Sequence, residues 1–175
     1  VCSPLAVARL QSLKSREAPK PFLVLVQGMQ AVDGLAWTEE ARELASIFWP
    51  GSLTLVLRDP ARIFPEGVRS SVGAVAIRVS PHPLVGALLK ALGAPLTSTS
   101  ANAPGAPPAR SGGEALQAAA DLDAGSEMWI LDFGPLPPSG PSTIVDCTGD
   151  RPSVIREGTI PVNRLTCALP ELHGR

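Results

Sequence analysis

Tyrosine is absent from this 175-residue chain, and cysteine and histidine are scarce. The three cysteines are an odd number and lie far apart, and with only two histidines no zinc-binding spacing can be assembled. No run approaches the roughly 18 apolar residues of a membrane-spanning helix, and no signal peptide is visible. We therefore expect a protein without a metal site or membrane partner, in the reduced cytoplasm.

An excess of charge of either sign is also missing. Fifteen basic residues against sixteen acidic ones leave a net charge of −1, which excludes a highly basic nucleic-acid coat protein but not a local basic patch. With 45% apolar and 18% charged residues, the chain has the composition of a globular protein rather than a disordered one. The length predicts a single domain over residues 1–175.

Helical and strand-like patterns alternate along the chain, which predicts an α/β domain with an open, largely mixed sheet. Proline, at 19 residues, is abundant and is expected mainly in stiff loops. The expected helices span residues 3–14, 38–49, 81–92 and 111–120, and the expected strands span 22–26, 53–57, 72–79, 95–98, 128–133, 143–147 and 152–156.

Two loops contain residues suited to binding an anion. Lys14, Arg16 and Lys20 lie among prolines between a helix and a strand, where they could clamp phosphate oxygens or simply be solvated. Four consecutive hydroxyl residues, 97–100, and Asn102 follow the end of a strand, where ligands of open α/β sheets collect. Ser98, Ser100 and Asn102 could surround an anion there, or form an ordinary polar turn.

Three further polar groups adjoin apolar strands. Arg78 lies inside the apolar stretch 75–79, and because arginine is seldom buried alone, we expect it to meet either a ligand anion or an internal acid. Ser142 precedes one strand and Arg156 ends another. We interpret His82 as structural, Cys147 as buried, and Trp37, Trp49 and Trp129 as core residues.

In their order, these segments resemble the YrdC/TsaC family of threonylcarbamoyl-AMP synthases, over about residues 2 to 160. The matching pieces are Lys14-x-Arg16 with Lys20-Pro21; Trp49-Pro50-Gly51-Ser52-Leu53-Thr54; Val75-Ala76-Ile77-Arg78-Val79 with His82-Pro83; Ser98-Thr99-Ser100-Ala101-Asn102 with Gly105; Ser142-Thr143-Ile144-Val145-Asp146; and Arg156-x-Gly158.

The resemblance implies a twisted open mixed sheet with flanking helices and a deep, positively charged cavity. It implies a nucleotidyltransferase that makes threonylcarbamoyl-AMP and pyrophosphate from L-threonine, bicarbonate and ATP with Mg²⁺, for a separate transferase complex that modifies adenosine in tRNA. By the same resemblance, ATP is bound by Lys14, Arg16, Lys20, Ser100, Asn102 and Arg156, and threonine by Arg78, Ser98 and Ser142.

The chain departs from the family pattern in two places. The family opens with a strand and a Pro-Thr-x-Thr-x-Tyr-Gly-Leu type segment that helps to bind threonine, and this sequence, which starts at Val1, has neither. We therefore expect that the N-terminal segment is missing from it. Pro108 also stands where some relatives have a nucleotide-contacting serine.

Two other functions remain open at this point. One is a non-catalytic RNA-binding or ribosome-associated module that uses the same basic cavity, although the net charge of −1 counts against extensive phosphate contacts. The other is a carbamoyl-adenylate-forming domain of a hydrogenase-maturation protein, which shares the implied fold. Weak RNA binding is compatible with the synthase as well.

Overall fold

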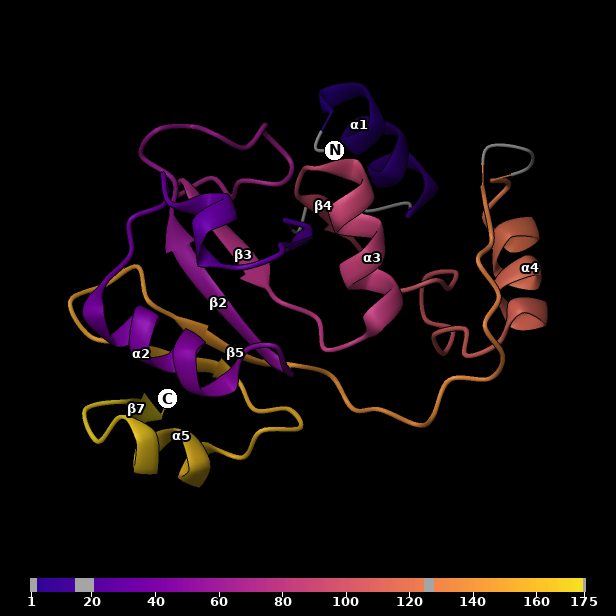
Figure 1. Ribbon diagram of the computed structural model, residues 1–175. Coiled ribbons are helices and arrows are strands. Elements are labelled where there is room, and N and C mark those ends of the chain that lie inside the picture. Colours follow the sequence, from indigo (N-terminus) through magenta and orange to yellow (C-terminus); the bar gives the residue numbers. More distant parts are fainter. Residues whose placement is uncertain (1–2, 15–20, 125–127, 175) are drawn as a thin grey trace.

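The computed structural model describes residues 3–14, 21–124 and 128–174. In these ranges the chain forms a seven-stranded sheet with the strand order β4-β1-β3-β2-β5-β6-β7, flanked by helices (Figure 1). In chain order the elements are α1 (Pro4–Leu13), β1 (Leu23–Leu25), the 3-10 helix η1 (Met29–Val32), α2 (Glu39–Phe48), β2 (Leu53–Arg58), β3 (Ala74–Arg78), α3 (Pro83–Leu92), β4 (Leu96–Ser98), α4 (Gly112–Asp121), β5 (Thr143–Asp146), β6 (Ser153–Arg156), α5 (Val162–Ala168) and β7 (His173–Gly174).

The sheet is mixed, as the alternating pattern predicts. β3 pairs in parallel with β1, and β2 with β5, while β2 and β3 run antiparallel to each other. The outer pairs β1–β4 and β5–β6 are antiparallel, and β6–β7 is parallel. Because β2 and β3 are antiparallel neighbours, the C-terminal end of β3 lies beside the N-terminal end of β2.

One face of the sheet forms the hydrophobic core. Val24, Ile77, Leu55 and Val145 are register partners across four strands, and each is fully buried. Helix α2 covers this face with its buried residues, after Thr38 caps it by accepting a hydrogen bond from the backbone N–H of Ala41 at 3.1 Å. The buried residues of α2 are Ala41, Leu44 and Ala45.

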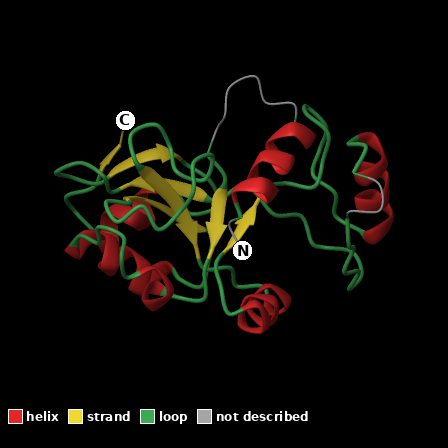
Figure 2. Ribbon diagram, turned by 90° about the horizontal axis from the view of Figure 1, so that it is seen from above, coloured by secondary structure: helices red, strands yellow, loops and turns green. Residues whose placement is uncertain are grey.

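The other face of the sheet is only partly covered. The register places Ser98, Leu23, Ala76, Val56 and Asp146 in one row across five strands, and each of them is of intermediate exposure. Figure 2 shows α1 and α2 on opposite sides of the strands. We call this partly covered side the open face of the sheet.

The segment 128–133 is not a strand, so that prediction is wrong. Its alternating apolar side chains belong to Trp129, Leu131 and Phe133, which are 92%, 59% and 74% exposed. An apolar alternation makes a strand only where a partner strand accepts its hydrogen bonds, and none pairs with this segment in the described chain. The prediction of a core position for Trp129 is therefore wrong as well.

The other tryptophans and His82 behave as predicted. Trp37 and Trp49 pack against the core, with their rings edge to face at 6.0 Å between centroids. His82 is the N-cap residue of α3, and its Nδ1 accepts a hydrogen bond from the backbone N–H of Leu84 at 3.3 Å. None of the helices in the described ranges has the length and apolar character that crossing a bilayer requires.

Candidate functional site

The open face of the sheet brings together the three residues that were predicted to bind threonine. Leu23 pairs with Ser98 and Leu25 with Arg78, and residues two apart on a strand share a face, so Ser98 and Arg78 lie on the same side of the sheet. Ser142 joins them from the start of β5, where its hydroxyl meets that of Thr54 on β2. Residues of β2, β3 and β4, together with Ser142 just before β5, thus lie on one face of the sheet.

Arg78 is held by the backbone, not by an internal acid. Its Nε donates a hydrogen bond to the carbonyl of Gly51 at 2.7 Å, and its Nη2 lies 3.5 Å from Oγ of Ser52. No carboxylate of the described residues bonds to it, so the half-buried guanidinium has no neutralising partner there. Burial lowers the pKa of Arg78, because desolvation disfavours the charged form of the guanidinium. An anionic ligand would supply the missing negative charge.

Ser142 connects β2 to Arg156. Its Oγ is 2.9 Å from Oγ1 of Thr54, and both residues are buried. Its carbonyl accepts two hydrogen bonds from Arg156, from Nη2 at 2.8 Å and from Nε at 3.2 Å. These bonds fix the Arg156 side chain beside the open face although the residue is exposed.

Thr143 fixes the loop that follows β6. Its Oγ1 donates to the carbonyl of Ile160 at 2.6 Å and accepts from the backbone N–H groups of Gly158 and Ile160, at 2.9 and 3.1 Å. The loop packs so closely that a Cβ on Gly158 would overlap the carbonyl of Pro141. This contact gives a physical reason for glycine in the Arg156-x-Gly158 motif.

Lys14 orders the hydroxyl-rich loop 99–106 through hydrogen bonds. It is 7% exposed, and its Nζ donates to the carbonyls of Ser100 and Asn102, at 2.7 and 2.6 Å, and to Oδ1 of Asn102 at 2.9 Å. An ammonium group has three N–H donors, and these three acceptors lie within hydrogen-bond distance of it. Ser100 Oγ adds a bond to Asn102 Oδ1 at 2.6 Å, and Asn102 Nδ2 donates to the carbonyl of Ala106 at 2.6 Å. The loop is thereby fixed around one buried cation.

The structure therefore places the predicted residues in two groups. Arg78, Ser98, Ser142 and Arg156 adjoin the open face of the sheet, and Lys14, Ser100 and Asn102 form the loop cluster. Arg16 and Lys20 lie outside the described residues. The positive charge of the predicted cavity stays a prediction.

Sequence reasoning assigned no role to Thr54, Ser52 or Thr143, although each stands in a motif quoted above. Each bonds directly to a predicted site residue or fixes the loop that carries one. A signal did exist for Thr54, because it is a polar side chain within the apolar strand 53–57, and a buried polar group needs a partner.

The donor set suits a phosphorylated substrate better than a directly bound metal. Within the described ranges no three His, Cys, Asp or Glu side chains cluster closely enough to hold a metal ion. The side chains that do gather are cations, hydroxyls and an amide, which bind phosphate and carboxylate oxygens. The fold and site thus define an open-sheet α/β protein with cations and hydroxyls gathered on and beside one face of the sheet.

Comparison with known proteins assigns the chain to a family. The family model for Sua5/YciO/YrdC, whose description reads "Telomere recombination", matches residues 1–158. The chain is 37% identical over 163 residues to a putative threonylcarbamoyl-AMP synthase of Mycobacterium tuberculosis (strain H37Rv), covering 91% of this chain and 72% of that protein. The chain belongs to the Sua5/YciO/YrdC family.

Other relatives are about twice as long as this chain. It is 32% identical to the threonylcarbamoyl-AMP synthase of Bacillus subtilis (strain 168) over 170 residues, which are 96% of this chain and 48% of that protein. The structure of Pyrococcus abyssi Sua5 complexed with L-threonine superimposes with a TM-score of 0.87 at 28% identity, over 99% of this chain and 50% of Sua5. Escherichia coli YciO shares the fold, with a TM-score of 0.75 at 23% identity.

Proposed function

We propose that the protein containing this chain is a threonylcarbamoyl-AMP synthase. It would convert L-threonine, bicarbonate and ATP to threonylcarbamoyl-AMP and pyrophosphate, for the modification of tRNA to N6-threonylcarbamoyladenosine. Family membership and the names of several relatives support this reaction. The observation that carries it for this chain is the gathering of Arg78, Ser98 and Ser142 on one face of the sheet.

In this proposal the open face binds threonine. The Arg78 guanidinium takes the amino-acid carboxylate, which supplies the counter-charge that its surroundings lack. Ser98 and Ser142 offer hydroxyls to the polar atoms of the same substrate. The L-threonine bound to Pyrococcus abyssi Sua5, a relative of the same fold, agrees with an amino-acid substrate.

The loop cluster and Arg156 bind ATP. Ser100 and Asn102 offer a hydroxyl and an amide to the nucleotide, and Lys14 acts through the loop that it holds and through its positive charge. Arg156 contacts the nucleotide from the open face, and Arg16 and Lys20 complete the phosphate contacts by sequence resemblance. Mg²⁺ enters as part of the substrate, bound to the ATP phosphates and water.

The chemistry needs orientation more than covalent participation by the protein. The threonine nitrogen adds to the carbon of CO₂ derived from bicarbonate and loses a proton, which gives a carbamate. A carbamate oxygen then attacks the α-phosphorus of ATP while the bond to the bridging α,β-oxygen breaks, and pyrophosphate leaves. Fixed cations and hydroxyls lower the barrier by holding the two substrates in line and by stabilising charge that develops on phosphate oxygens.

The wider setting is part of the same proposal. Residues 1–175 act as one domain of the enzyme, in the cytoplasm. The threonylcarbamoyl-adenylate passes to a separate transferase complex that modifies tRNA, and weak contact with tRNA accompanies the transfer.

Pyrophosphate release by the full-length gene product tests the reaction. We expect pyrophosphate from ATP and Mg²⁺ only when threonine and bicarbonate are both present, and we expect mass spectrometry to detect the threonylcarbamoyl-adenylate. Serine and valine serve as matched amino-acid controls, because each lacks one part of the threonine side chain. Pyrophosphate release that is indifferent to threonine would overturn the proposal.

A further inference from the structure

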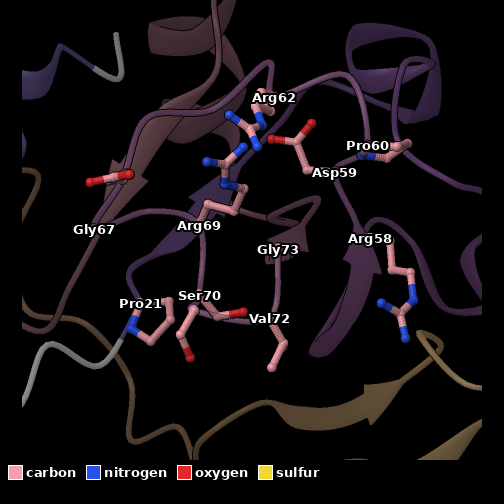
Figure 3. A pocket seen from close by; sticks show the side chains of 12 residues that line it. Pro21, Arg58, Asp59, Pro60, Arg62, Gly67, Arg69, Ser70, Val72 and Gly73 are labelled. Carbon is pink, nitrogen blue, oxygen red and sulfur yellow. The ribbon is translucent and has the colours of Figure 1, made fainter.

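A polar pocket lies at the other end of β2 and β3 from Arg78. It has a volume of about 840 Å³ and includes Arg58 at the end of β2 and Gly73 just before β3 (Figure 3). A strand advances about 3.3 Å per residue, so the length of β3 separates this pocket from Arg78 by about 13 Å. Three arginines line it, namely Arg58, Arg62 and Arg69, and we call it the arginine pocket.

Arg62 and Arg69 have unused hydrogen-bonding capacity. Figure 3 shows their guanidinium groups directed toward one another. In the described part of the chain, neither side chain makes a hydrogen bond or ion pair with another residue. Arg58 differs, because its Nε donates to the carbonyl of Thr148 at 2.8 Å. Figure 3 also shows the Asp59 carboxylate directed toward this pair, and two guanidinium groups that face each other repel unless anions offset their charges.

The acids of the pocket only partly offset these cations. Asp59 is 3% exposed, and its two carboxylate oxygens accept the backbone N–H groups of Ile63 and Phe64, at 2.9 and 3.0 Å. Asp59 therefore shapes the turn that carries Arg62. With Glu66 as the second acid, three arginines and two carboxylates leave a net charge of +1 on the lining.

Backbone hydrogen bonds join the chain segments that line the pocket. The N–H of Asp59 donates to the carbonyl of Gly73 at 2.8 Å, and the N–H of Ser70 donates to the carbonyl of Ala74 at 2.8 Å. Gly73 has φ +74°, a left-handed conformation that glycine adopts without strain. These bonds fix Ser70 and the neighbouring Arg69 to the ends of β2 and β3. The backbone that carries the arginines is therefore held in place before a ligand binds.

We propose that the arginine pocket binds a phosphate group at the opposite end of β2 and β3 from Arg78, although one lining residue, Pro21, directly follows Lys20, which the proposed function assigns to ATP. Guanidinium forks match the spacing of phosphate oxygens, and the Ser70 and Ser71 hydroxyls at the wall can add further hydrogen bonds. The phosphate comes either from a free small molecule, such as pyrophosphate, or from the backbone of a nucleic acid.

Calorimetric titration of the full-length gene product with inorganic pyrophosphate tests this site. The titration is done with and without a saturating non-hydrolysable ATP analogue and threonine, which occupy the proposed synthase site. We expect pyrophosphate to bind in both conditions. Arg62→Gln and Arg69→Gln should each weaken the binding that persists beside the analogue by about tenfold or more, because each removes a charged hydrogen-bonding partner.

The matched control is Arg164→Gln, which removes the same charge from an exposed position on α5 and should leave the binding unchanged. Loss of all pyrophosphate binding when the analogue is present, or equal binding by the wild type and both variants, would overturn the inference. If the protein does not bind the analogue, the proposed function fails, and the comparison of Arg62→Gln with Arg164→Gln still tests the pocket. If a short single-stranded RNA competes with pyrophosphate, the natural ligand is the phosphate backbone of a nucleic acid. If the RNA does not compete, the ligand is a free small molecule that carries a phosphate.

Discussion

The hydroxyls of Thr54 and Ser142, which are 88 residues apart in the sequence, lie 2.9 Å from each other in a buried position. Thr54 belongs to β2, and Ser142 immediately precedes β5, the parallel neighbour of β2. The Ser142 carbonyl also accepts two hydrogen bonds from Arg156, whose Nη2 lies 3.4 Å from the Ser142 hydroxyl as well. Thr54 therefore positions Ser142, which is proposed to bind threonine. The Ser142 carbonyl in turn positions Arg156, which is proposed to bind ATP.

Thr54→Val should raise the KM for threonine while changing kcat less. Valine matches threonine in shape but removes the shorter of the two hydrogen bonds of the buried Ser142 hydroxyl, whose other partner is Nη2 of Arg156 at 3.4 Å, and losing such a bond costs about 1 kcal/mol in the free energy of unfolding. Thr54→Ser keeps the hydroxyl and is the control, in which the KM should stay close to that of the wild type. If Thr54→Val loses stability with an unchanged KM for threonine, Thr54 has only a structural role.

Arg78→Lys should raise the threonine requirement strongly with little change in the melting temperature of the ligand-free protein. Lysine keeps a positive charge but loses the planar fork that holds a carboxylate by two bonds. The bond to the Gly51 carbonyl is one that a lysine ammonium can replace in part. Threonine dependence and thermal melting are measured on the same preparation. A variant that melts early but keeps its threonine affinity would remove Arg78 from the binding site.

Lys14→Met should destabilise the loop cluster before any ligand is added. The substitution keeps the length of the apolar chain but leaves the Ser100 carbonyl and both Asn102 oxygens without the ammonium. We expect a lower melting temperature and weaker ATP binding together. Lys90→Met, on the exposed side of α3, is the control and should change neither. Weaker ATP binding at an unchanged melting temperature would show that Lys14 contacts the phosphates directly instead.

The elements that were predicted well from the sequence carry their own local signals. Thr38 with two glutamates opens α2, Pro83 after His82 opens α3, and Ser111 caps α4 by accepting from the N–H of Glu114. Helix α5 was missed because it has only seven residues and follows Pro161, an N-cap residue without a side-chain hydrogen bond, and η1 and β7 are shorter still. Residues 128–133 show the opposite error, because they were predicted to form a strand and do not. Their apolar alternation is a local pattern, whereas a strand also needs a partner elsewhere in the chain.

The candidate site likewise contains residues that could be predicted from the sequence and contacts that could not. Arg78 was identifiable because a charged residue in an apolar strand is conspicuous, and Ser142 and Arg156 because polar groups adjoin strand ends. The partnership of Thr54 with Ser142 could not be predicted, because it depends on β2 and β5 becoming parallel neighbours. The tether from Lys14 to Asn102 also spans 88 residues, so the sequence showed two separate polar loops where the structure joins them.

Gly158→Ala should damage the site, whereas Gly86→Ala should not. An added Cβ on Gly158 would meet the Pro141 carbonyl and the Ser142 backbone, and no flexible side-chain end is there to move away. We expect a fall in the free energy of unfolding and weaker binding of both substrates. Gly86, within α3, has no atom within 4 Å of the added Cβ, and alanine there should stabilise the helix by up to about 1 kcal/mol. Urea unfolding of both variants checks this contrast, and equal stability of the two would contradict the packing described.

The thiols of Cys147 and Cys167 should differ sharply in reactivity. Burial, followed by the negative charges of Asp146 and Glu40, raises the pKa of Cys147 to about 12, whereas Cys167 is exposed. Since the thiolate is the reactive form, iodoacetamide at pH 8 should alkylate Cys167 quickly and Cys147 only after unfolding in urea. Peptide mapping by mass spectrometry separates the two sites. Because the raised pKa keeps the thiol neutral in the folded state, its contribution to stability is present below pH 9 and is lost as the pH rises toward 12. Rapid labelling of Cys147 in the folded protein would show that the end of β5 opens to solvent, which would contradict a site built on a rigid β2–β5 pair.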